Sequence, residues 1–435
     1  MERNQKLTAL IEGSRAAVGV VGLGYVGLPL AAAFAERGFP VTAFESDPAR
    51  AAALKSGRSY VPDVPASLLR SIAKAGTLRV AKGPADYARQ DVLVFCVQTP
   101  WRKTQEPDMG PLVQAASAAA KSIKRGSLVI VESTTWPGAT EEILKPVLEK
   151  SGLKAGKDFH LAFSPERIDP GNPRFGLANT PKVVGGLDAE ATRLACALYS
   201  RIVERVVPVS SARAAELVKL LENSFRAVNI ALVGEIARIC RALGLDVWEV
   251  IDAAATKPFG FMPFYPGPGI GGHCIPKDPK LLAWKMKSLN FEARMIDLAS
   301  AINASMPQYA VDRLAEALNE SKKALKGSRI LILGVAYKPG VPDVRESPAV
   351  DVMTLLLRAG AKVSYHDPYV AEIEAGGRTM ESSPLGAAIL SRADAVAILT
   401  AHPGMDYDLV FKRAKIVFDA RNALSKKKRP GLYRL

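Results

Sequence analysis

Residues 17–27, AVGVVGLGYVG, decide the fold of this chain. A short apolar run leads directly into the pattern GxGxxG, formed by Gly22, Gly24 and Gly27. In a βαβ unit the first glycine permits the turn, the second lets the backbone approach a pyrophosphate, and the third lets the helix pack on the strand. The helix N-terminus then faces the phosphates. The stretch therefore predicts a dinucleotide-binding site at the carboxyl end of a parallel strand.

The next strand supplies the carboxylate that such a site requires. The stretch VTAFESDP (41–48) contains Glu45, which suits the two ribose hydroxyls of NAD and repels the 2′-phosphate of NADP. Asp47 is the rival carboxylate, although Glu45 is nearer the strand end, and the positive charge of Arg50 weakens the preference for NAD. The predicted cofactor contacts in this part of the chain are Gly22, Gly24, Tyr25, Val26, Gly27, Glu45 and Arg50.

A similar pattern of strands returns near the other end of the chain. RILILGVAYKPG (329–340), KVSYHDP (362–368) and DAVAILTAHP (394–403) echo the first strands, with helical stretches between them. From about residue 207 to 256 the sequence has helical periodicity and no strand signal. We predict an α/β fold in which two Rossmann-like, doubly wound parallel-sheet domains are joined by a central helical domain. The predicted domains are 1–206, which binds NAD, 207–310, which is helical, and 311–435, which carries the second sheet.

The second glycine-rich turn lacks the glycine triplet. Ala336 and Lys338 stand where the first turn has Gly24 and Val26. The chain is therefore predicted to have one NAD site.

Ligands in open parallel sheets lie beyond the carboxyl ends of the strands. VQTP (97–100) and VESTTWPG (131–138) both follow apolar strands. Thr99, Thr134 and Thr135 are therefore expected to face the cofactor, with ordinary turn threonines as the alternative.

SPERIDPGN (164–172) places the charged residues Glu166 and Arg167 between prolines after a strand. We expect this shaped loop to be functional, and an ordinary surface ion pair is the alternative.

On a largely apolar helix, Lys219, Asn223 and Arg226 recur at i, i+4 and i+7 on one face. We expect this polar face to be functional, and a stripe of solvent-exposed polar residues is the alternative.

The stretch GGHCIPKDP (271–279) surrounds Cys274 with His273, Lys277 and Asp278. Positive neighbours stabilise a thiolate, and the two glycines leave room for a ligand. The stretch therefore predicts a reactive thiol, with a small buried thiol as the alternative.

The composition excludes several classes of protein. The chain has 435 residues, of which 48% are hydrophobic and 23% charged, and it has no run of about 18 apolar residues, so we expect no membrane span. We expect no signal peptide, because no apolar stretch follows a basic one at the start. Four widely spaced cysteines predict neither a metal site nor a disulfide framework and favour the cytoplasm. The net charge is +15, but the positive residues are mostly scattered, so we expect no nucleic-acid partner.

Together these stretches resemble the UDP-glucose/GDP-mannose dehydrogenase superfamily, and within it the UDP-N-acetylglucosamine 6-dehydrogenase branch. The resemblance rests on seven motifs in order over nearly the whole chain: GLGYVGLPLA, VQTP, ESTTWPG, SPERIDPGN, KLLENSFRAVNIAL, YPGPGIGGHCIPKDP and YKPGVPDVRESPA. It implies an NAD-dependent, four-electron oxidation of the C6 alcohol of a UDP-sugar to the uronic acid, without a metal. It also implies that the third domain binds the UDP-sugar and that the central helix forms a homodimer.

The resemblance further implies roles for individual residues. Cys274 is the nucleophile that holds the sugar as a thiohemiacetal and then as a thioester. Lys219 is the acid/base and oxyanion-stabilising group, and Asn223 helps to hold the oxyanion or its water. Asp278 orients that water or acts as a base, and Glu166 is the base for thioester hydrolysis. The other implied contacts are Thr135, Thr99 and Arg345 at the cofactor, and Arg167, Ile168, Lys219, Asn223, Arg226, Tyr265, Gly271, Tyr337, Lys338 and Arg421 at the substrate.

The form of two motifs indicates the sugar. This chain reads PERIDPG where UDP-glucose dehydrogenases typically read PEFLREG, so Arg167 replaces the phenylalanine and Pro170 the second glutamate. It also has YPGPGIGGHC rather than GGSC. The resemblance therefore favours UDP-N-acetylglucosamine, with Arg167 or Arg226 hydrogen-bonding the acetamido carbonyl. UDP-N-acetylmannosamine, UDP-N-acetylgalactosamine and UDP-glucose are the alternatives, and a non-enzymatic nucleotide-sensing module is another.

Overall fold

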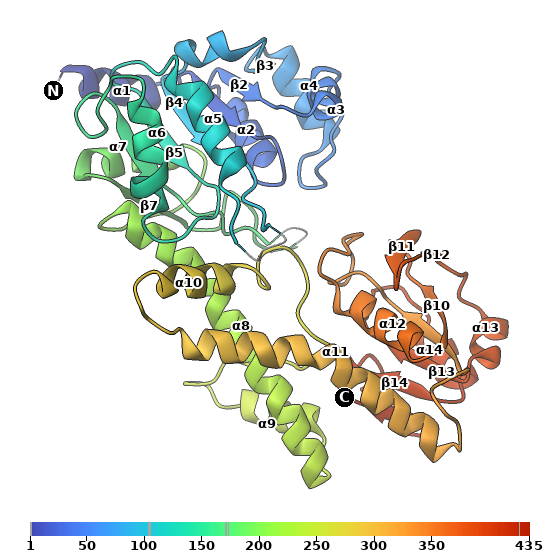
Figure 1. Cartoon of the computed structure of the whole chain (residues 1–435). Helices are drawn as coiled ribbons and strands as arrows, with labels where there is room; N and C mark the ends of the chain where they lie inside the picture. The colour runs from blue at the N-terminus through green and yellow to red at the C-terminus, as the bar shows by residue number, and fades with distance from the viewer. Residues whose placement is uncertain (1, 103–105, 170–171, 173, 426) are drawn as a thin grey trace. The chain divides into compact units, whose positions relative to one another are not determined.

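The computed structural model describes residues 2–102, 106–169, 172, 174–425 and 427–435 (Figure 1). Its contacts divide the chain into two compact units, Met1–Leu221 and Glu222–Leu435. Each unit contains a large, mostly or wholly parallel sheet and its own hydrophobic cores. Within these described ranges, no helix is long and apolar enough to cross a membrane.

The first unit is built on an eight-stranded sheet of order β3-β2-β1-β4-β5-β6-β7-β8. Neighbouring strands run parallel except β6 and β7. The order of β1 to β6 is that of a doubly wound dinucleotide-binding sheet, which confirms the predicted fold class. The strands are β1 (Val18–Val21), β2 (Val41–Phe44), β3 (Leu78–Val80), β4 (Val92–Phe95), β5 (Leu128–Val131), β6 (His160–Phe163), β7 (Lys182–Gly186) and β8 (Val206–Pro208). The helices are α1 (Glu2–Glu12), α2 (Gly27–Glu36), α3 (Pro48–Lys55), α4 (Ala66–Lys74), η1 (Pro84–Arg89), α5 (Gly110–Ala120), η2 (Thr140–Leu144), α6 (Lys145–Glu149), α7 (Ala189–Tyr199) and the first part of α8 (Ala212–Leu243).

Both faces of this sheet are buried by helices. In β4, Val92 and Val94 belong to one core together with α2 and α7, whereas Leu93 and Phe95 belong to another together with α5 and α6. Side chains alternate between the two faces of a strand, so a continuous apolar run is the pattern of a strand covered on both sides. Solvent and ligands therefore reach the sheet at the ends of its strands, where the loops lie.

The second unit contains a five-stranded parallel sheet of order β10-β9-β13-β14-β15. Ile330 and Ile332 of β9 pack with α11 and α12, while Leu331 and Leu333 pack with α13 and α14. The strands are β9 (Arg329–Leu333), β10 (Lys362–His366), β11 (Glu372–Ala375), β12 (Arg378–Glu381), β13 (Ala395–Ile398), β14 (Val417–Asp419) and β15 (Leu432–Arg434). The helices, besides the rest of α8, are α9 (Val247–Ala255), α10 (Asp278–Lys287), α11 (Arg294–Glu320), α12 (Pro348–Arg358), α13 (Ala387–Arg392) and α14 (Tyr407–Arg413).

The predicted domain boundaries fall inside elements of this structure. The boundary between residues 206 and 207 lies in β8, and that between 310 and 311 lies in α11. The expectation of no strand from about residue 207 is wrong for Val207 and Pro208, because they pair with β7. The helical stretch itself is confirmed by α8 and α9. The division into three domains stays a prediction.

Candidate active site

In the turn between β1 and α2, nearby backbone atoms leave no room for a side chain at two of the three glycines. Gly22 has a φ of 88°, and a Cβ there would lie 3.0 Å from the carbonyl oxygen of Cys96. A Cβ on Gly27 would lie 1.9 Å from the carbonyl oxygen of Gly22. Around Gly24, by contrast, no atom of the described residues other than its chain neighbours lies within 4 Å of that position. The open space at Gly24 fits the close approach of a pyrophosphate to the N-terminus of α2.

Glu45 directly follows β2 and faces this turn. Its Oε2 accepts a hydrogen bond from the backbone N–H of Leu23 at 3.0 Å, and its Oε1 accepts one from Asp47 at 2.9 Å. The side chain of Asp47 instead caps α3 and lies 3.8 Å from the guanidinium of Arg50. These contacts favour Glu45 over Asp47 as the carboxylate that binds ribose.

Tyr60 also holds the turn, by donating its hydroxyl to the carbonyl of Leu23 at 2.8 Å. Burial raises the pKa of Tyr60 to about 12, so it stays a neutral donor at neutral pH. The guanidinium of Arg50 lies 5.7 Å from the centre of the Tyr60 ring. Of the remaining predicted contacts in the turn, Tyr25 is exposed and Val26 immediately precedes α2.

The threonines after β4 and β5 have different surroundings. Thr99 donates its hydroxyl to the carbonyl of Thr134 at 2.8 Å, which joins the two loops. Thr135 is buried, and its hydroxyl donates to Glu216 of α8 at 3.2 Å. Glu216 also accepts from the hydroxyl of Thr140 and from two backbone N–H groups, and these bonds oppose the burial that raises its pKa. Glu216 lies outside all of the motifs recognised in the sequence.

Glu166 and its neighbours form a tight loop after β6. Oε1 of Glu166 accepts from the backbone N–H groups of Arg167 at 2.6 Å and Ile168 at 2.5 Å. The guanidinium of Arg167 donates to the carbonyl of Pro181 at 2.6 Å. Pro170, at which this chain departs from UDP-glucose dehydrogenases, lies outside the described residues.

A buried cluster of charges, which sequence reasoning missed, lies next to Glu166. Nζ of Lys182 is 2.7 Å from Oε2 of Glu132 and 3.6 Å from Oε2 of Glu166. The hydroxyl of Tyr199 donates to the other carboxylate oxygen of Glu132. Burial raises the pKa of Glu132. Burial also lowers the pKa of Lys182, but the two carboxylates outweigh it and raise that pKa above its ordinary value.

The three polar residues predicted on one face of α8 differ in burial. Lys219 is 9% exposed and makes no hydrogen bond or ion pair within the described residues. Asn223 is 8% exposed and donates to Oδ2 of the buried Asp278 at 2.6 Å. Arg226 is exposed. A solvated stripe is therefore excluded for Lys219 and Asn223 but not for Arg226.

Cys274 is exposed in the turn that leads into α10. Its carbonyl accepts from the N–H groups of Lys277 at 3.0 Å and Asp278 at 2.8 Å, so Asp278 begins the helix close to the cysteine backbone. Burial and the charge of Lys277 lower the pKa of His273. His273 is therefore neutral at neutral pH and supplies no positive charge to the thiol, which corrects the expectation for that residue.

The glycines before Cys274 are required by two side chains from the loops of the second sheet. A Cβ on Gly271 would lie 2.6 Å from Cβ of Tyr337, and one on Gly272 would lie 2.8 Å from the Tyr337 ring. A Cβ on Gly267 would lie 2.2 Å from Nη1 of Arg421. Burial lowers the pKa of Arg421 to about 10, which leaves it protonated at neutral pH. The structure thus brings together Gly271 and Tyr337, and sets Arg421 against the same loop.

The remaining predicted contacts of the second unit are Tyr265, Lys338 and Arg345. The hydroxyl of Tyr265 donates to Asp252 of α9 at 2.7 Å. Lys338 is half-buried. The guanidinium of Arg345 pairs with Asp343 at 2.6 Å.

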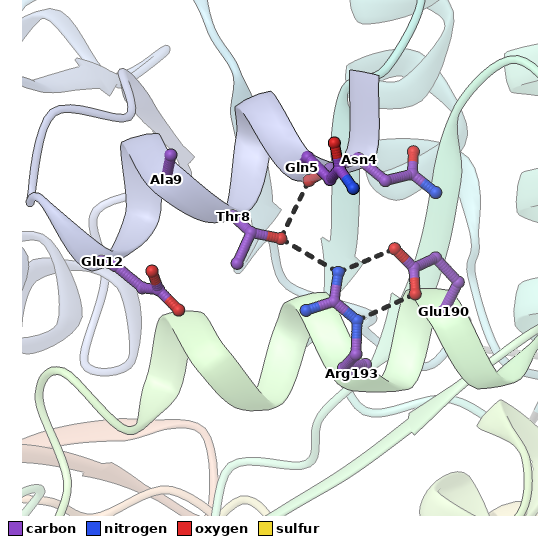
Figure 2. A pocket seen from close by; sticks show the side chains of 7 residues that line it. All are labelled: Asn4, Gln5, Thr8, Ala9, Glu12, Glu190 and Arg193. Carbon is purple, nitrogen blue, oxygen red and sulfur yellow. Dashed lines mark hydrogen bonds and ion pairs between the residues drawn. The ribbon is translucent and has the colours of Figure 1, made fainter. Parts of the chain in front are cut away.

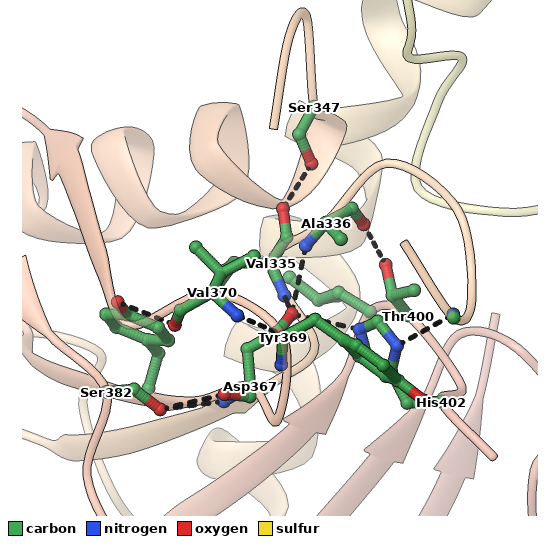
Figure 3. A network of polar contacts seen from close by, with 12 residues as sticks. Val335, Ala336, Ser347, Asp367, Tyr369, Val370, Ser382, Thr400 and His402 are labelled. Carbon is green, nitrogen blue, oxygen red and sulfur yellow. Dashed lines mark hydrogen bonds and ion pairs between the residues drawn. The ribbon is translucent and has the colours of Figure 1, made fainter. Parts of the chain in front are cut away.

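The second sheet has its own carboxylate at the position that corresponds to Glu45. Asp367 follows β10, is 4% exposed, and accepts from Nε2 of His402 at 2.9 Å and from the N–H groups of Val335, Ala336, Tyr369 and Val370 (Figure 3). Nδ1 of His402 accepts from the N–H of Gly340, which leaves Nε2 as the ring atom that donates to Asp367. Five donors fill the acceptor sites of Asp367, which leaves none for a ribose. This supports the prediction of a single NAD site, in the first unit.

A shallow hollow of about 420 Å³ lies between α1 and α7 (Figure 2). In it, Arg193 donates to Thr8 at 2.9 Å and pairs with Glu190 at 2.8 Å, so its polar groups already bind one another. None of the predicted site residues lines it. In the part of the chain that the structure describes, no group of three or more His, Cys, Asp or Glu side chains is arranged to hold a metal.

Three family models match the chain in succession. The NAD binding domain of the UDP-glucose/GDP-mannose dehydrogenase family matches residues 16–203, its central domain 213–305 and its UDP binding domain 331–426.

Individual proteins are similar over nearly the whole chain. UDP-N-acetyl-D-mannosamine dehydrogenase from Pyrococcus horikoshii is 35% identical over 414 residues, which cover 94% of this chain and 96% of that protein. UDP-N-acetyl-D-glucosamine 6-dehydrogenase from Pseudomonas aeruginosa is 36% identical over 387 residues, covering 88% and 90%. A solved structure of UDP-D-ManNAc dehydrogenase from Pyrococcus horikoshii has a TM-score of 0.86 at 35% identity, covering 96% of this chain and 98% of that one.

Proposed function

Because the chain belongs to the UDP-glucose/GDP-mannose dehydrogenase family, we propose that it oxidises the C6 alcohol of UDP-N-acetylglucosamine to the uronic acid. Like its relatives it is an NAD-dependent UDP-sugar dehydrogenase. The observation that supports the chemistry most directly is the Cys274 turn. There an exposed thiol precedes Asp278, whose carboxylate is buried against the amide of Asn223 at 2.6 Å.

The reaction divides into steps for which this chain has suitable groups. NAD, when bound, accepts one hydride from C6 in each of two rounds. Lys219 and Asn223 stabilise the charge on the C6 oxygen, and Asp278 helps to pass its proton to solvent. The thiolate of Cys274 forms a C–S bond with the aldehyde carbon, so that the aldehyde cannot escape before the second oxidation produces a thioester. Water then attacks the thioester carbon, Glu166 takes the water proton, the C–S bond breaks, and Cys274 leaves as the thiolate.

Further contacts are assigned by their place in the motifs. At the cofactor we assign Gly22, Gly24, Tyr25, Val26, Gly27, Glu45, Arg50, Thr99, Thr135 and Arg345. At the substrate we assign Arg167, Ile168, Lys219, Asn223, Arg226, Tyr265, Gly271, Tyr337, Lys338 and Arg421. The contacts of Gly271 and Gly267 with Tyr337 and Arg421 support the second group.

The acetamido sugar is favoured by Arg167. Its backbone is fixed by Glu166, and a guanidinium at this position can donate to an acetamido carbonyl as a phenylalanine cannot. UDP-N-acetylmannosamine is the second candidate, because the Pyrococcus horikoshii relative named for that sugar is 35% identical to this chain. NADH absorbance with UDP-N-acetylglucosamine, its manno and galacto epimers and UDP-glucose separates the candidates. The highest kcat/KM for UDP-glucose would contradict the proposal.

We propose a homodimer formed through α8. Phe225, Leu232, Ile239 and Leu243 are exposed apolar residues, and the first three recur every seven residues. On a helix this spacing makes one stripe, which a second copy would cover. Light scattering should give the mass of a dimer for the wild-type chain and that of a monomer for Leu232→Glu, whereas an unchanged mass for the variant would contradict this interface.

We also place the enzyme in the cytoplasm, where a reducing environment keeps the thiol of Cys274 available. The three predicted domains then act as NAD-binding, dimer-forming and UDP-sugar-binding parts.

A further inference from the structure

We propose that Lys182 is a positioning residue for hydrolysis: it orients the carboxylate of Glu166, the proposed base, and places a positive charge beside it. The inference rests on the proposed function, in which Glu166 is the base that activates water. It assigns a role to a buried lysine that none of the sequence motifs includes.

The geometry fixes Glu166 at both of its oxygens. Oε1 accepts from the backbone N–H groups of Arg167 and Ile168, at 2.6 and 2.5 Å. Oε2 lies 3.6 Å from Nζ of Lys182. Lys182 begins β7, which pairs with β6, the strand that leads into Glu166. The sheet therefore determines where the ammonium lies relative to the carboxylate.

The second carboxylate, Glu132, holds the lysine in place. Glu132 and Lys182 are both buried and lie 2.7 Å apart. The hydroxyl of Tyr199 donates to Oε1 of Glu132, the oxygen that does not contact Lys182. The Lys182 ammonium lies 5.1 Å from the centre of the Tyr199 ring. These contacts anchor the ammonium, which lies within 4 Å of both Glu132 and Glu166.

The charges of this cluster suit a base that must take up a proton. With Lys182 protonated and both glutamates ionised, the three residues carry a net charge of −1. Burial raises the pKa of the Cys96 thiol and of the Tyr199 hydroxyl, so these two neighbours are neutral. The guanidinium of Arg167 donates to the carbonyl of Pro181, the residue before Lys182, and is a further positive charge nearby. A proton accepted by Glu166 makes the cluster neutral. The positive charge of Lys182 favours the carboxylate form of Glu166, whereas the negative charge of Glu132 favours the protonated form. Lys182 and Glu132 therefore act on Glu166 in opposite directions.

Three variants separate this role from a merely structural ion pair. Lys182→Met removes the cation and should move the pH at which hydrolysis reaches half its maximal rate upward, by about one pH unit or more. Glu132→Gln removes a competing negative charge and should move it downward. The double variant Lys182→Met with Glu132→Gln leaves no buried charge without a partner, so it keeps the test open if the first variant does not fold. It should still move the midpoint upward, because Lys182 is in direct contact with Glu166.

The assay follows the decay of the acyl adduct on Cys274 by rapid quench and intact-protein mass spectrometry at a series of pH values. Opposite shifts for the two single variants, or an upward shift for the double variant, support the proposal. Unchanged midpoints, or shifts of the two single variants in the same direction, in chains that still bind NAD and form the adduct would overturn it. A wild-type chain that forms no NADH with any UDP-sugar would instead overturn the proposed function and the inference with it.

Discussion

Replacing Glu45 with alanine should remove the preference of this chain for NAD over NADP. Each oxygen of Glu45 accepts one backbone hydrogen bond, at 3.0 and 2.9 Å, and keeps a second lone pair for a ribose hydroxyl. A hydrogen bond to a charged group contributes about 1.5–3 kcal/mol. With NADP, a phosphate about 4 Å from the carboxylate costs about 4 kcal/mol per pair of unit charges at a dielectric of about 20, and about 1 kcal/mol in water. Glu45 is partly exposed, so we take about 2 kcal/mol, which corresponds to a discrimination of about 30-fold.

The assay is calorimetric titration of the chain with NAD and with NADP. The ratio of the two Kd values should change by at least about 30-fold in Glu45→Ala. Asp47→Ala is the matched control, because it removes the cap of α3, costs about 1 kcal/mol of stability and should leave the ratio unchanged. A wild-type ratio in Glu45→Ala, or loss of the preference in Asp47→Ala, would refute the ribose assignment.

Three more predictions concern the thiol, the sugar and stability in acid. Cys274→Ser should abolish acid formation while NAD still binds, since a serine oxygen does not form a readily hydrolysed intermediate here; full acid production would contradict covalent catalysis. Arg167→Phe should weaken binding of the acetamido sugar more than that of UDP-glucose, by about 1–3 kcal/mol, and equal losses would remove this role. Arg79 and the N–H of Lys82 lower the pKa of Asp86 to about 2, so this carboxylate contributes stability above its unfolded pKa and loses it as the pH falls toward 2. In denaturant titrations, Asp86→Asn should therefore be less stable than wild type at neutral pH and lose less stability in acid; equal pH slopes would contradict this.

The fold could be predicted from local patterns because its strands are apolar runs covered on both faces. Gly22, Gly24 and Gly27 were recognisable as a cofactor turn, and the structure shows two reasons for them: crowding at the outer glycines and open space at Gly24. The three-residue β8 was missed because it carries too few residues to show a pattern.

Part of the candidate site follows from the sequence and part does not. Glu132 directly follows β5, so the strand-end rule that selected Thr134 would also have selected this carboxylate. Lys182 and Glu216 carried no such signal, because their importance depends on partners 16 to 81 residues away in the chain. The neutral state of His273 depends on burial and on Lys277, and the sequence alone shows only the second.

Covalent catalysis at Cys274 is tested by the amount of NADH formed when UDP-N-acetylglucosamine is limiting, measured together with the mass of the product. We expect two NADH for each sugar, the uronic acid as product and no free aldehyde, because Cys274 holds the intermediate while the single NAD site exchanges its cofactor. One NADH for each sugar, with the aldehyde in solution, would contradict it.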